Sequence, residues 1–418
     1  MATIADGRTI PFDWYSDPAV LRLERERIFR RTWQYAGRTD QAAETGAFFT
    51  CDLGGIPIVV VRDEEGGLRA FLNVCRHRGS LVCEGEGKRA SLQCPYHAWT
   101  YGLDGSLRAA PRSELVPGFD KESLGLVPVA ADSWGPFVFV NPDPEAEPLA
   151  ETLGELPTLV AASGVDLESL RFLKRASGDE YAANWKVCSE NFLECYHCQV
   201  AHPGFSKVVD VSVDAYVLEE SGLVSTQYGP VREAWKGDFD PRGPITRGQF
   251  HFLWPNVTLN MMPGQPNLSI GPIVPTGPET TARFLDYFVG PDVEHEWVEE
   301  MLEFDDQVGA EDRVLVERVQ KGLRGGGVEH GRLMGDSERL IAHFQGLLLG
   351  QAGDADHEEL VQVRREEAAH LQPLEERQTL VGGKVEQAPV VLECRELAVQ
   401  QTPGRLPGSD RDHPLSMS

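Results

Sequence analysis

Two short cysteine–histidine pairs constrain this chain more than any other feature. In the stretch NVCRHRGSLVCEGEGKRASLQCPYHAW, Cys75 and His77 are separated by one residue, and Cys94 and His97 by two. Each pair lies in a segment that contains glycine or proline, where tight turns form. Each turn therefore supplies one thiolate and one imidazole, and both side chains bind transition metals.

This mixed pairing predicts a Rieske [2Fe–2S] cluster. Such a cluster has two cysteines on one iron and two histidines on the other, and the neutral imidazoles raise its reduction potential. Zinc fingers usually pair like with like. Gly79 and Pro95 suit turns whose N–H groups face the sulfurs, and Tyr96 and Trp99 can shield the cluster. A zinc site and chance core cysteines are the alternatives, and Cys83 is interpreted as an ordinary buried thiol.

The composition argues against several classes of partner. Of the 418 residues, 41% are hydrophobic, which is enough for a large core in more than one unit. The net charge of -26 repels phosphate backbones and anionic lipid, so we expect neither nucleic-acid nor membrane binding. We find no apolar signal segment, no membrane-spanning run and no disulfide scaffold among the eight scattered cysteines, so we expect a protein of the reducing cytoplasm.

Apolar runs and turn signals predict an α+β fold: a small all-β domain, then a larger domain with an antiparallel sheet covered by helices. The predicted parts are an N-terminal helical segment packing on the larger domain (1–40), the all-β domain with the cysteine–histidine pairs (41–147), the larger domain (148–350) and a partly disordered tail (351–418).

Within these parts, several elements are predicted. Helices are expected at 18–34, at 150–175 and, as one long helix, at about 293–323. A strand over GDEYAANWKV is expected to lead into a helix through SENFLECYHCQV, which ends at Pro203 and Gly204.

A second metal site is predicted in NWKVCSENFLECYHCQVAHPGF. Glu194, His197 and His202 match the donor types of the two-histidine, one-carboxylate triad of Fe(II) oxygenases. On an ideal helix the two histidines would lie about 140° apart, so the helix must end or distort between them. Asn191 and Glu194 would share a helix face and point toward the metal without both binding it. The alternative is two hydrogen-bonded histidines on a buried helix.

The third donor is ambiguous from periodicity alone. The helix near 297–319 has an apolar stripe whose members are Trp297, Met301, Phe304, Val308, Leu315 and Val319. Asp312 lies near the centre of that stripe, where a lone carboxylate is costly unless it is paired or bound to metal. Asp305 also lies near the stripe, and Glu194 is a further candidate. Cys195 and Cys198 are interpreted as small core residues and not as a redox pair.

At these residues the chain resembles the Rieske non-haem iron oxygenases, the α-type large subunits of ring-hydroxylating and related oxygenases. The resemblance covers roughly residues 15–345. The segment EDRVLVERVQKGL resembles the family's third-ligand segment, which places the ligand at Asp312. The resemblance also implies a helix-grip, START-like catalytic domain. It gives Glu194 a bridging role between the mononuclear iron of one subunit and the cluster of the next, and hence implies a homotrimer.

The resemblance implies the terminal oxygenase component of a multicomponent enzyme, with a Rieske cluster and mononuclear Fe(II) as cofactors. Such a component uses O₂, and electrons from a separate NAD(P)H-dependent reductase or ferredoxin, to hydroxylate or oxidatively demethylate a small organic substrate. No G-x-G-x-x-G follows a predicted strand, so we expect the chain not to bind NAD(P)H itself.

Substrate choice is the least constrained prediction. ENFLECYHCQVAHPGF resembles the choline, glycine-betaine and carnitine oxygenase branch, which implies a quaternary amine; an aromatic ring or acid is the alternative. Tyr228, Trp235, Phe252 and Trp254 are either cation–π faces for the ammonium or core aromatics of the sheet. Two other classes remain open, a Rieske electron-transfer protein and a ligand-carrier module. Neither would bind iron at His197 and His202.

Overall fold

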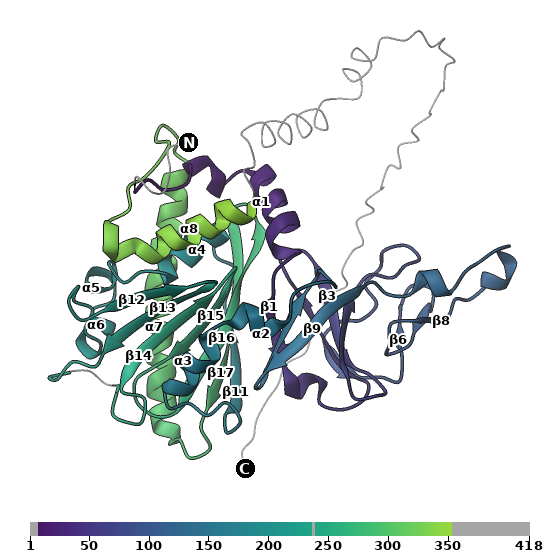
Figure 1. The fold of residues 1–418 in the computed structure, drawn as a ribbon, viewed down its shortest axis with the longest axis horizontal. Helices are drawn as coiled ribbons and strands as arrows, with labels where there is room; N and C mark the ends of the chain where they lie inside the picture. The colour runs from purple at the N-terminus through teal and green to yellow at the C-terminus, as the bar shows by residue number, and fades with distance from the viewer. Residues whose placement is uncertain (1–6, 236–238, 353–418) are drawn as a thin grey trace, which may run out of the picture. The chain divides into compact units, whose positions relative to one another are not determined.

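The computed structural model describes residues 7–235 and 239–352. Its N-terminal part contains a seven-stranded antiparallel sheet of order β1-β10-β9-β4-β3-β2-β5 and a small sheet of order β6-β7-β8 (Figure 1). Runs such as PIVVVR and FVFVN supply the branched and aromatic residues that strands favour. The strands are β1 (Gln34–Arg38), β2 (Ala47–Asp52), β3 (Pro57–Arg62), β4 (Leu68–Leu72), β5 (Glu86–Lys88), β6 (Leu92–Gln93), β7 (Thr100–Tyr101), β8 (Leu107–Ala109), β9 (Pro128–Trp134) and β10 (Phe137–Asn141).

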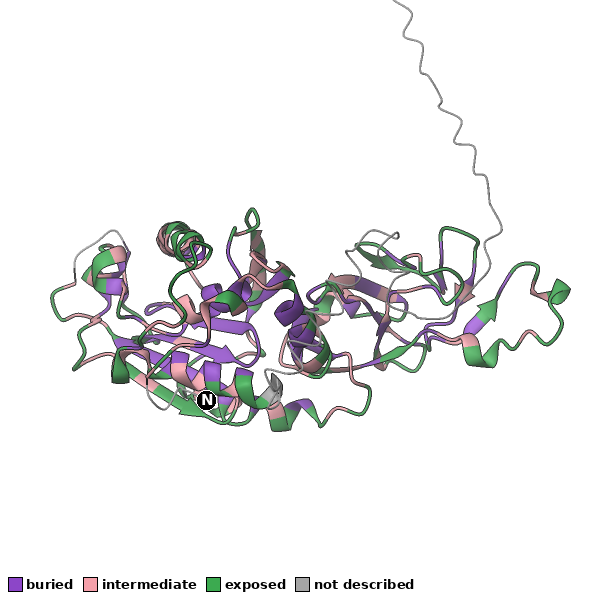
Figure 2. Ribbon diagram, turned by 90° about the horizontal axis from the view of Figure 1, so that it is seen from above, coloured by how far each residue is buried: buried purple, intermediate pink, exposed green. Residues whose placement is uncertain are grey.

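A second seven-stranded antiparallel sheet has the order β11-β17-β16-β15-β14-β13-β12. Figure 2 shows its strands as a largely buried layer. Successive residues of a strand face opposite sides, so β17 sends Phe288 and Tyr287 into two different core clusters. The strands are β11 (Arg171–Ser177), β12 (Val217–Ser221), β13 (Val224–Pro230), β14 (Arg247–Leu253), β15 (Val257–Met261), β16 (Asn267–Gly277) and β17 (Thr280–Val289).

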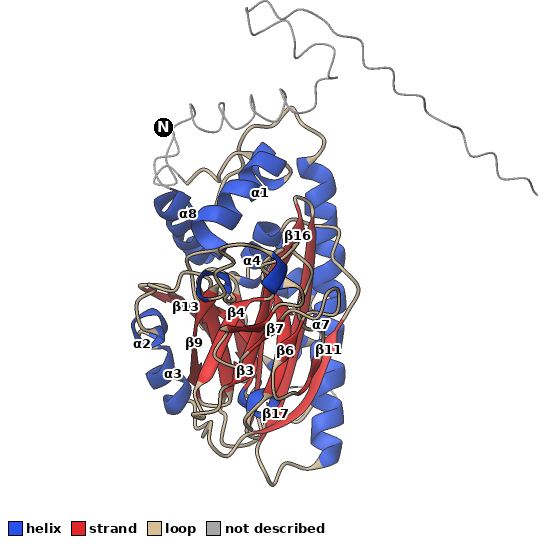
Figure 3. Cartoon of the chain, turned by 90° about the vertical axis from the view of Figure 1, so that its right-hand side faces the viewer, coloured by secondary structure: helices blue, strands red, loops and turns tan. Residues whose placement is uncertain are grey.

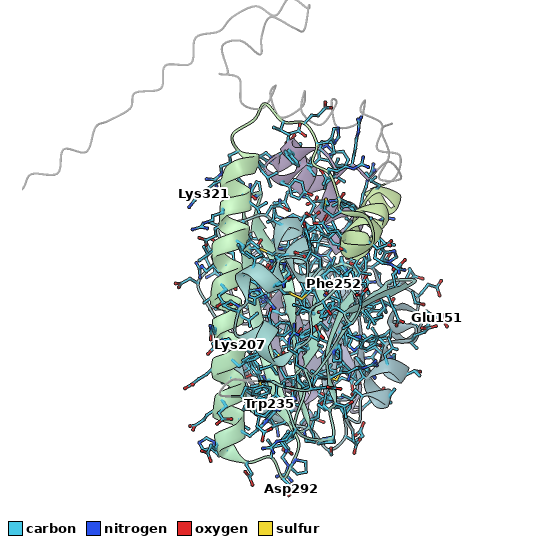
Figure 4. The ribbon with its side chains drawn as sticks, turned by 90° about the vertical axis from the view of Figure 1, so that its left-hand side faces the viewer. Glu151, Lys207, Trp235, Phe252, Asp292 and Lys321 are labelled. Atoms are coloured by element: carbon cyan, nitrogen blue, oxygen red, sulfur yellow. A yellow bond between two sulfur atoms is a disulfide. The ribbon has the colours of Figure 1, made fainter. Side chains whose placement is uncertain are left out.

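Helices cover both faces of this second sheet. Leucines of α2 and α3 pack on the face that carries Phe288, whereas Trp297 and Met301 of α7 pack on the face that carries Tyr287 (Figure 3). Figure 4 shows α7 along one side of the chain, with Lys321 near its C-terminal end. The α-helices are α1 (Pro18–Glu24), α2 (Leu149–Leu153), α3 (Leu156–Ala162), α4 (Trp185–Phe192), α5 (Cys198–Ala201), α6 (Phe205–Val208), α7 (His295–Leu323) and α8 (Arg339–Ala352).

Shorter helical turns lie at the N-terminus, in the loops of the first sheet and before α8. They are η2 (Phe12–Tyr15), η3 (Arg25–Phe29), η4 (Thr39–Ala42), η5 (Ser113–Leu115), η6 (Glu122–Leu124) and η7 (Gly335–Glu338).

Buried polar contacts join the N-terminal elements to the second sheet and to α4. The Glu24 carboxylate of α1 accepts a hydrogen bond from the Lys186 ammonium of α4 at 2.6 Å, and both side chains are buried. The Tyr35 hydroxyl of β1 donates to Asp286 of β17 at 2.6 Å, and Arg175 of β11 binds the same carboxylate. These buried charges are each paired, as burial requires.

The α+β prediction is confirmed: an all-β part comes first, and an antiparallel sheet covered by helices follows. The predicted long helix is α7. In the N-terminal segment, Phe29 packs against Trp185 of α4, with ring centroids 5.0 Å apart.

Three local predictions are wrong. The helix expected over 18–34 leaves α-geometry after Glu24, and Gln34 already begins β1, which pairs with β10. The region 150–175 is helical only to Ala162, because RFLKRAS pairs with β17 as strand β11. GDEYAANWKV forms no strand beyond a single bridge from Tyr181 to Thr281.

The four-part division of the chain stays a prediction. The residues predicted as a disordered tail, 351–418, lie outside the described ranges except for the first two, which end α8. Among the described helices, none combines the length and apolar composition needed to cross a membrane.

Candidate active site and metal centres

The two cysteine–histidine loops lie between β4 and β7. Cys75 and Cys94 are buried, whereas His77 and His97 are exposed. The two imidazole rings approach edge to face with centroids 4.7 Å apart. Trp99 is buried and stacks on His77, with centroids 5.0 Å apart. The four predicted ligands thus meet in one place, with sulfurs inside and imidazoles outside.

Hydrogen-bond donors surround the two sulfurs. The Tyr101 hydroxyl lies 3.3 Å from Cys75 Sγ and accepts from the Arg76 N–H. Burial acts to raise the pKa of Cys94, but N–H groups of Tyr96 and His97 point at its sulfur and leave that pKa below its ordinary value. Donors around thiolates stabilise a negatively charged cluster. Tyr101 was not among the predicted site residues, although it lies only two residues after Trp99, which was expected to shield the cluster.

The donor set fits a two-iron cluster. A single tetrahedral ion would hold all four donor atoms within about 4 Å of one another. Among the described residues, the one group of three or more donor atoms this close together is formed by His197, His202 and Asp312. The four cysteine and histidine donors are therefore spaced more widely than a single ion requires. The Tyr96 ring lies over His97, with ring centroids 3.9 Å apart, and Tyr96 is 57% exposed. Cys83 is a buried free thiol, as interpreted.

The predicted second site brings three donor atoms together. His197 Nε2 and His202 Nε2 lie 3.1 Å apart, and Asp312 Oδ1 lies 3.1 Å from His202 Nε2 and 3.4 Å from His197 Nε2. A metal with bonds of about 2.1 Å at right angles separates its donors by about 3.0 Å. The residues therefore fit one face of an octahedral iron, which leaves the opposite positions open.

A break in the helix makes this possible. α4 ends at Phe192, and the two histidines flank the short helix α5 as its N-cap and C-cap. The Glu194 carboxylate accepts hydrogen bonds from the N–H groups of Tyr196 and His197, which satisfies the backbone of the turn between the helices. The expected distortion between the histidines is present, but Asn191 and Glu194 do not lie on one continuous helix with them.

Two carboxylates hold the outer nitrogens of the histidines. Glu194 contacts His197 Nδ1, and Glu311 Oε2 lies 2.7 Å from His202 Nδ1. A carboxylate at Nδ1 fixes the tautomer and turns the Nε2 lone pair toward the metal. Glu194 is thus on the side of His197 away from the donor triangle. Sequence analysis missed Glu311, although an acidic neighbour of a ligand is the signal to look for.

Electrostatics support a cation at this point. Burial alone would lower the pKa of His197, but the carboxylates of Asp312 and Glu194 raise it to about 9. The same histidines hold the pKa of Asp312 well below its usual range, despite burial. The site therefore favours positive charge between its donors, which an Fe(II) ion supplies.

Asp305 occupies a different place from Asp312. Its carboxylate accepts a hydrogen bond from the Tyr287 hydroxyl, and burial raises its pKa. The buried face of α7 also differs from the predicted stripe at its C-terminal end, where Val316 and Gln320 are buried and Val319 is 50% exposed. Asp305 and Asp312 both lie on this buried face, but only Asp312 reaches the histidines.

Cys195 and Cys198 are buried in the adjoining core cluster, as expected, but they are joined by a disulfide that sequence analysis did not predict.

A cavity of about 380 Å³ opens beside the donor triangle. Its wall includes His197, His202, Asp312, Glu194 and Asn191. Aromatic rings enclose much of the rest, among them Phe205, Tyr216, Phe250 and Tyr287. A concave, mainly apolar cavity with a few converging polar groups is the usual form of a small-molecule site.

The aromatics singled out in the sequence lie elsewhere. Phe252 and Trp254 belong to the core cluster around α4 and α8, and Tyr228 carries the Arg247 guanidinium 3.7 Å from its ring centroid. None of these, nor Trp235, lines the cavity found in the described residues. The core interpretation therefore holds for Phe252 and Trp254, and these four are not the rings of the cavity.

Two family models match the chain. Residues 32–120 match the Rieske [2Fe-2S] domain, and residues 167–349 match the ring hydroxylating alpha subunit (catalytic domain). The carnitine monooxygenase oxygenase subunit of Escherichia coli (strain K12) is 36% identical over 351 residues, covering 81% of this chain and 92% of that protein. The chloroplastic choline monooxygenase of Atriplex hortensis is 34% identical over 346 residues, covering 81% and 77%.

Solved structures show the same fold. A quaternary ammonium Rieske monooxygenase in complex with L-carnitine superimposes with a TM-score of 0.73 at 32% identity, covering 84% of this chain and 98% of that chain. A Rhodococcus naphthalene 1,2-dioxygenase superimposes with a TM-score of 0.68 at 20% identity, covering 83% and 95%, a likeness of fold alone.

Proposed function

Because the chain belongs to the Rieske non-haem iron oxygenases, the family of the ring-hydroxylating α subunits, we propose that it hydroxylates or oxidatively demethylates a quaternary amine. The chain is an O₂-dependent oxidoreductase of this family. The observation that carries the substrate proposal is a ring-lined cavity directly beside three converging donors. Relatives named for carnitine and choline support the same substrate class.

The proposed cluster ligands are Cys75, His77, Cys94 and His97, and the proposed ligands of the mononuclear iron are His197, His202 and Asp312. When bound, the cluster stores single electrons and the ferrous ion activates dioxygen. The chain's own residues prepare the site: Glu194 and Glu311 orient the imidazoles, and the apolar walls exclude water and hold the substrate beside the donors.

Glu194 is proposed to link neighbouring subunits of a homotrimer. A separate reductase or ferredoxin is proposed as the electron donor, and the cytoplasm as the location of the enzyme. His77 and His97 are exposed, which suits contact with another chain. No hydrogen bond, ion pair or ring contact in the described ranges joins these two histidines to α4, α5 or α7.

Oxygen consumption tests the substrate class. The iron-loaded protein, supplied with a surrogate reductase, is offered quaternary amines and aromatic acids in parallel, with product analysis. We expect about three irons per chain and oxygen uptake coupled to quaternary-amine oxidation. Turnover of aromatic acids alone would instead assign an aromatic hydroxylase. Two irons per chain and no turnover with any substrate would leave an electron-transfer protein.

Mixing two inactive variants tests the subunit arrangement. A His97→Ala chain lacks a cluster ligand, and an Asp312→Ala chain lacks an iron ligand. If sites on neighbouring chains cooperate, refolded mixtures regain part of the activity that neither variant shows alone. Absence of recovery in assemblies proven to be mixed would contradict the bridge.

A further inference from the structure

Among the charged residues of the cavity wall, Arg283 of β17 and Asp305 of α7 take no part in the donor triangle or its supporting carboxylates. Both side chains belong to elements that the sheet and its covering helix hold in place. Their roles are open once the iron ligands and the orienting carboxylates have been assigned.

Arg283 lacks the partners that a buried guanidinium normally has. Its Nε is buried and has no hydrogen-bond acceptor in the described residues. No carboxylate in those ranges lies within 4.0 Å of it as an ion pair. Arg313, the other arginine of the wall, differs, because it donates to the carbonyl of Glu180 at 2.8 Å and to Glu317 at 3.1 Å. Arg283 lines the cavity, and the geometry of a carboxylate matches a guanidinium that has no partner among the described residues.

Arg283 is also close to the metal donors. It lines, together with Asp312 and Asn191, a small recess beside the main cavity.

Asp305 places a carboxyl group in the same cavity; burial opposes its ionised form, and a cation bound beside it would favour that form. It lies seven residues before Asp312, about two helical turns or 10 Å along α7. Its carboxylate bonds to the Tyr287 hydroxyl and has no cationic partner within 4.0 Å in the described part of the chain. Phe205, Phe250 and Tyr287 line the same cavity. Rings and a carboxylate together are the usual environment of a quaternary ammonium.

We propose that Arg283 and Asp305 recognise the two ends of a zwitterion, so that the substrate is a trimethylammonium carboxylate and not a trimethylammonium alcohol. This inference rests on the proposed function, because it assumes that the cavity binds a quaternary amine. It separates two substrate classes that the relatives leave equally open, since one is named for carnitine and another for choline. The competing explanation is that Arg283 only offsets the negative charge of Asp305 and Asp312.

Binding without turnover tests the proposal. Titration calorimetry on the oxygen-free, iron-loaded enzyme compares three probe series of matched length: trimethylammonium carboxylates, trimethylammonium alcohols, and carboxylates in which a tert-butyl group replaces the ammonium. We expect the zwitterions to bind at least about 10-fold more tightly than either other series.

Variants assign each end. Arg283→Gln is expected to weaken the zwitterions by about 10- to 100-fold while the alcohols stay within about twofold. Asp305→Asn keeps a hydrogen-bonding partner for Tyr287 and is expected to weaken both ammonium series equally but not the tert-butyl carboxylates. Arg247→Gln, which removes a cation from the same sheet outside the cavity, is the matched control and should change none of the three affinities.

Other outcomes are separable. If Arg283→Gln weakens alcohols and zwitterions alike, or if wild type prefers the alcohols, the zwitterion proposal is overturned while the quaternary-amine function stands. If no ammonium probe binds and none is oxidised, the proposed function itself fails. Arg283→Lys guards against misfolding. This variant should retain iron and keep part of the preference for zwitterions over alcohols that Arg283→Gln loses. If Arg283 were only a structural counter-charge, Arg283→Lys would restore binding of all probes to the wild-type level, with no preference for zwitterions over alcohols.

Discussion

The two metal sites differ in how the chain builds them. The proposed cluster ligands all lie between residues 75 and 97, on two loops of one small region. The mononuclear site joins His197 and His202 to Asp312, which is on a helix more than a hundred residues later in the chain. The first site therefore depends on local turn geometry, and the second on how α7 packs against the sheet.

Their supporting contacts differ in the same way. Around the cluster, backbone N–H groups and Tyr101 face the sulfurs, and Asn73 bonds to Val82 and Cys83 within the same loop. Around the iron site, side-chain carboxylates hold the histidines, one of them from α7. The cluster loops are held by contacts within the same short segment, so substitutions elsewhere in the chain should change their geometry little. The iron site is assembled from separate elements, so its geometry depends on how those elements pack.

Removal of the distant ligand should have the largest effect. Asp312→Ala is expected to lose the mononuclear iron and at least about 100-fold in activity, because even an outer carboxylate is worth about 10- to 100-fold. The Rieske signal should remain. Iron content and electron paramagnetic resonance measure both sites at once. Asp305→Ala, on the same helix face, is the control and should keep its iron; the reverse result would exchange the two assignments.

The two outer carboxylates should separate orientation from bridging. Glu311→Gln is expected to weaken iron binding by about 10- to 100-fold, with activity restored by excess iron. Glu194→Gln is expected to retain iron when iron is in excess and yet lose turnover that excess iron does not restore, because Glu194 is proposed to bridge subunits as well as to orient His197. Iron titration and oxygen uptake on both variants provide the measurement. Loss of the mononuclear iron in Glu194→Gln even with excess iron would make Glu194 a ligand, and recovery of turnover by excess iron would leave it an orienting residue without a bridging role.

A half-buried carboxyl on α4, that of Glu190, tests the long-range support of the second site. Burial raises the pKa of Glu190 to about 7, although Tyr15 and Gln345 bond to its carboxyl. Between about pH 5 and 7 the folded chain therefore keeps a proton that the unfolded chain has released, so stability falls as pH rises through that window.

Glu190→Gln keeps the hydrogen bonds without the charge and should flatten this profile, with a gain on the order of 2 kcal/mol at pH 7. Denaturant midpoints at pH 5, 6 and 7 measure it. A variant whose profile stays as steep as that of wild type would show that another group titrates.

The smallest effect is expected at the cluster. Tyr101→Phe removes the hydroxyl 3.3 Å from Cys75 Sγ, and loss of a donor to the thiolate should lower the reduction potential by about 40–60 mV. Redox titration of the visible spectrum measures the change, and the mononuclear iron content should not change. An unaltered potential would mean that the hydroxyl does not donate to the sulfur.

Much of the fold could be predicted from the chain, but not its breaks. The apolar pattern predicted α7 correctly because a long amphipathic helix repeats one signal many times. The helical region expected at 150–175 includes residues 171–175, which instead belong to strand β11, because pairing with β17 overrides local preference. The end of α4 at Phe192 was not predicted either. The Glu194 carboxylate accepts hydrogen bonds from backbone N–H groups of the following turn, and the helical pattern of the sequence does not reveal such side-chain contacts.

Residue spacing along the chain is enough to identify the family and to predict the four cluster ligands and the histidine pair, because those donors are close together in the chain. Spacing does not show that Asp312 and not Asp305 meets the histidines, that Glu311 contacts the outer nitrogen of His202, or that Arg283 and Asp305 line one cavity. Those relations depend on the rotation and position of α7 against β17, which long-range packing sets and local spacing does not encode.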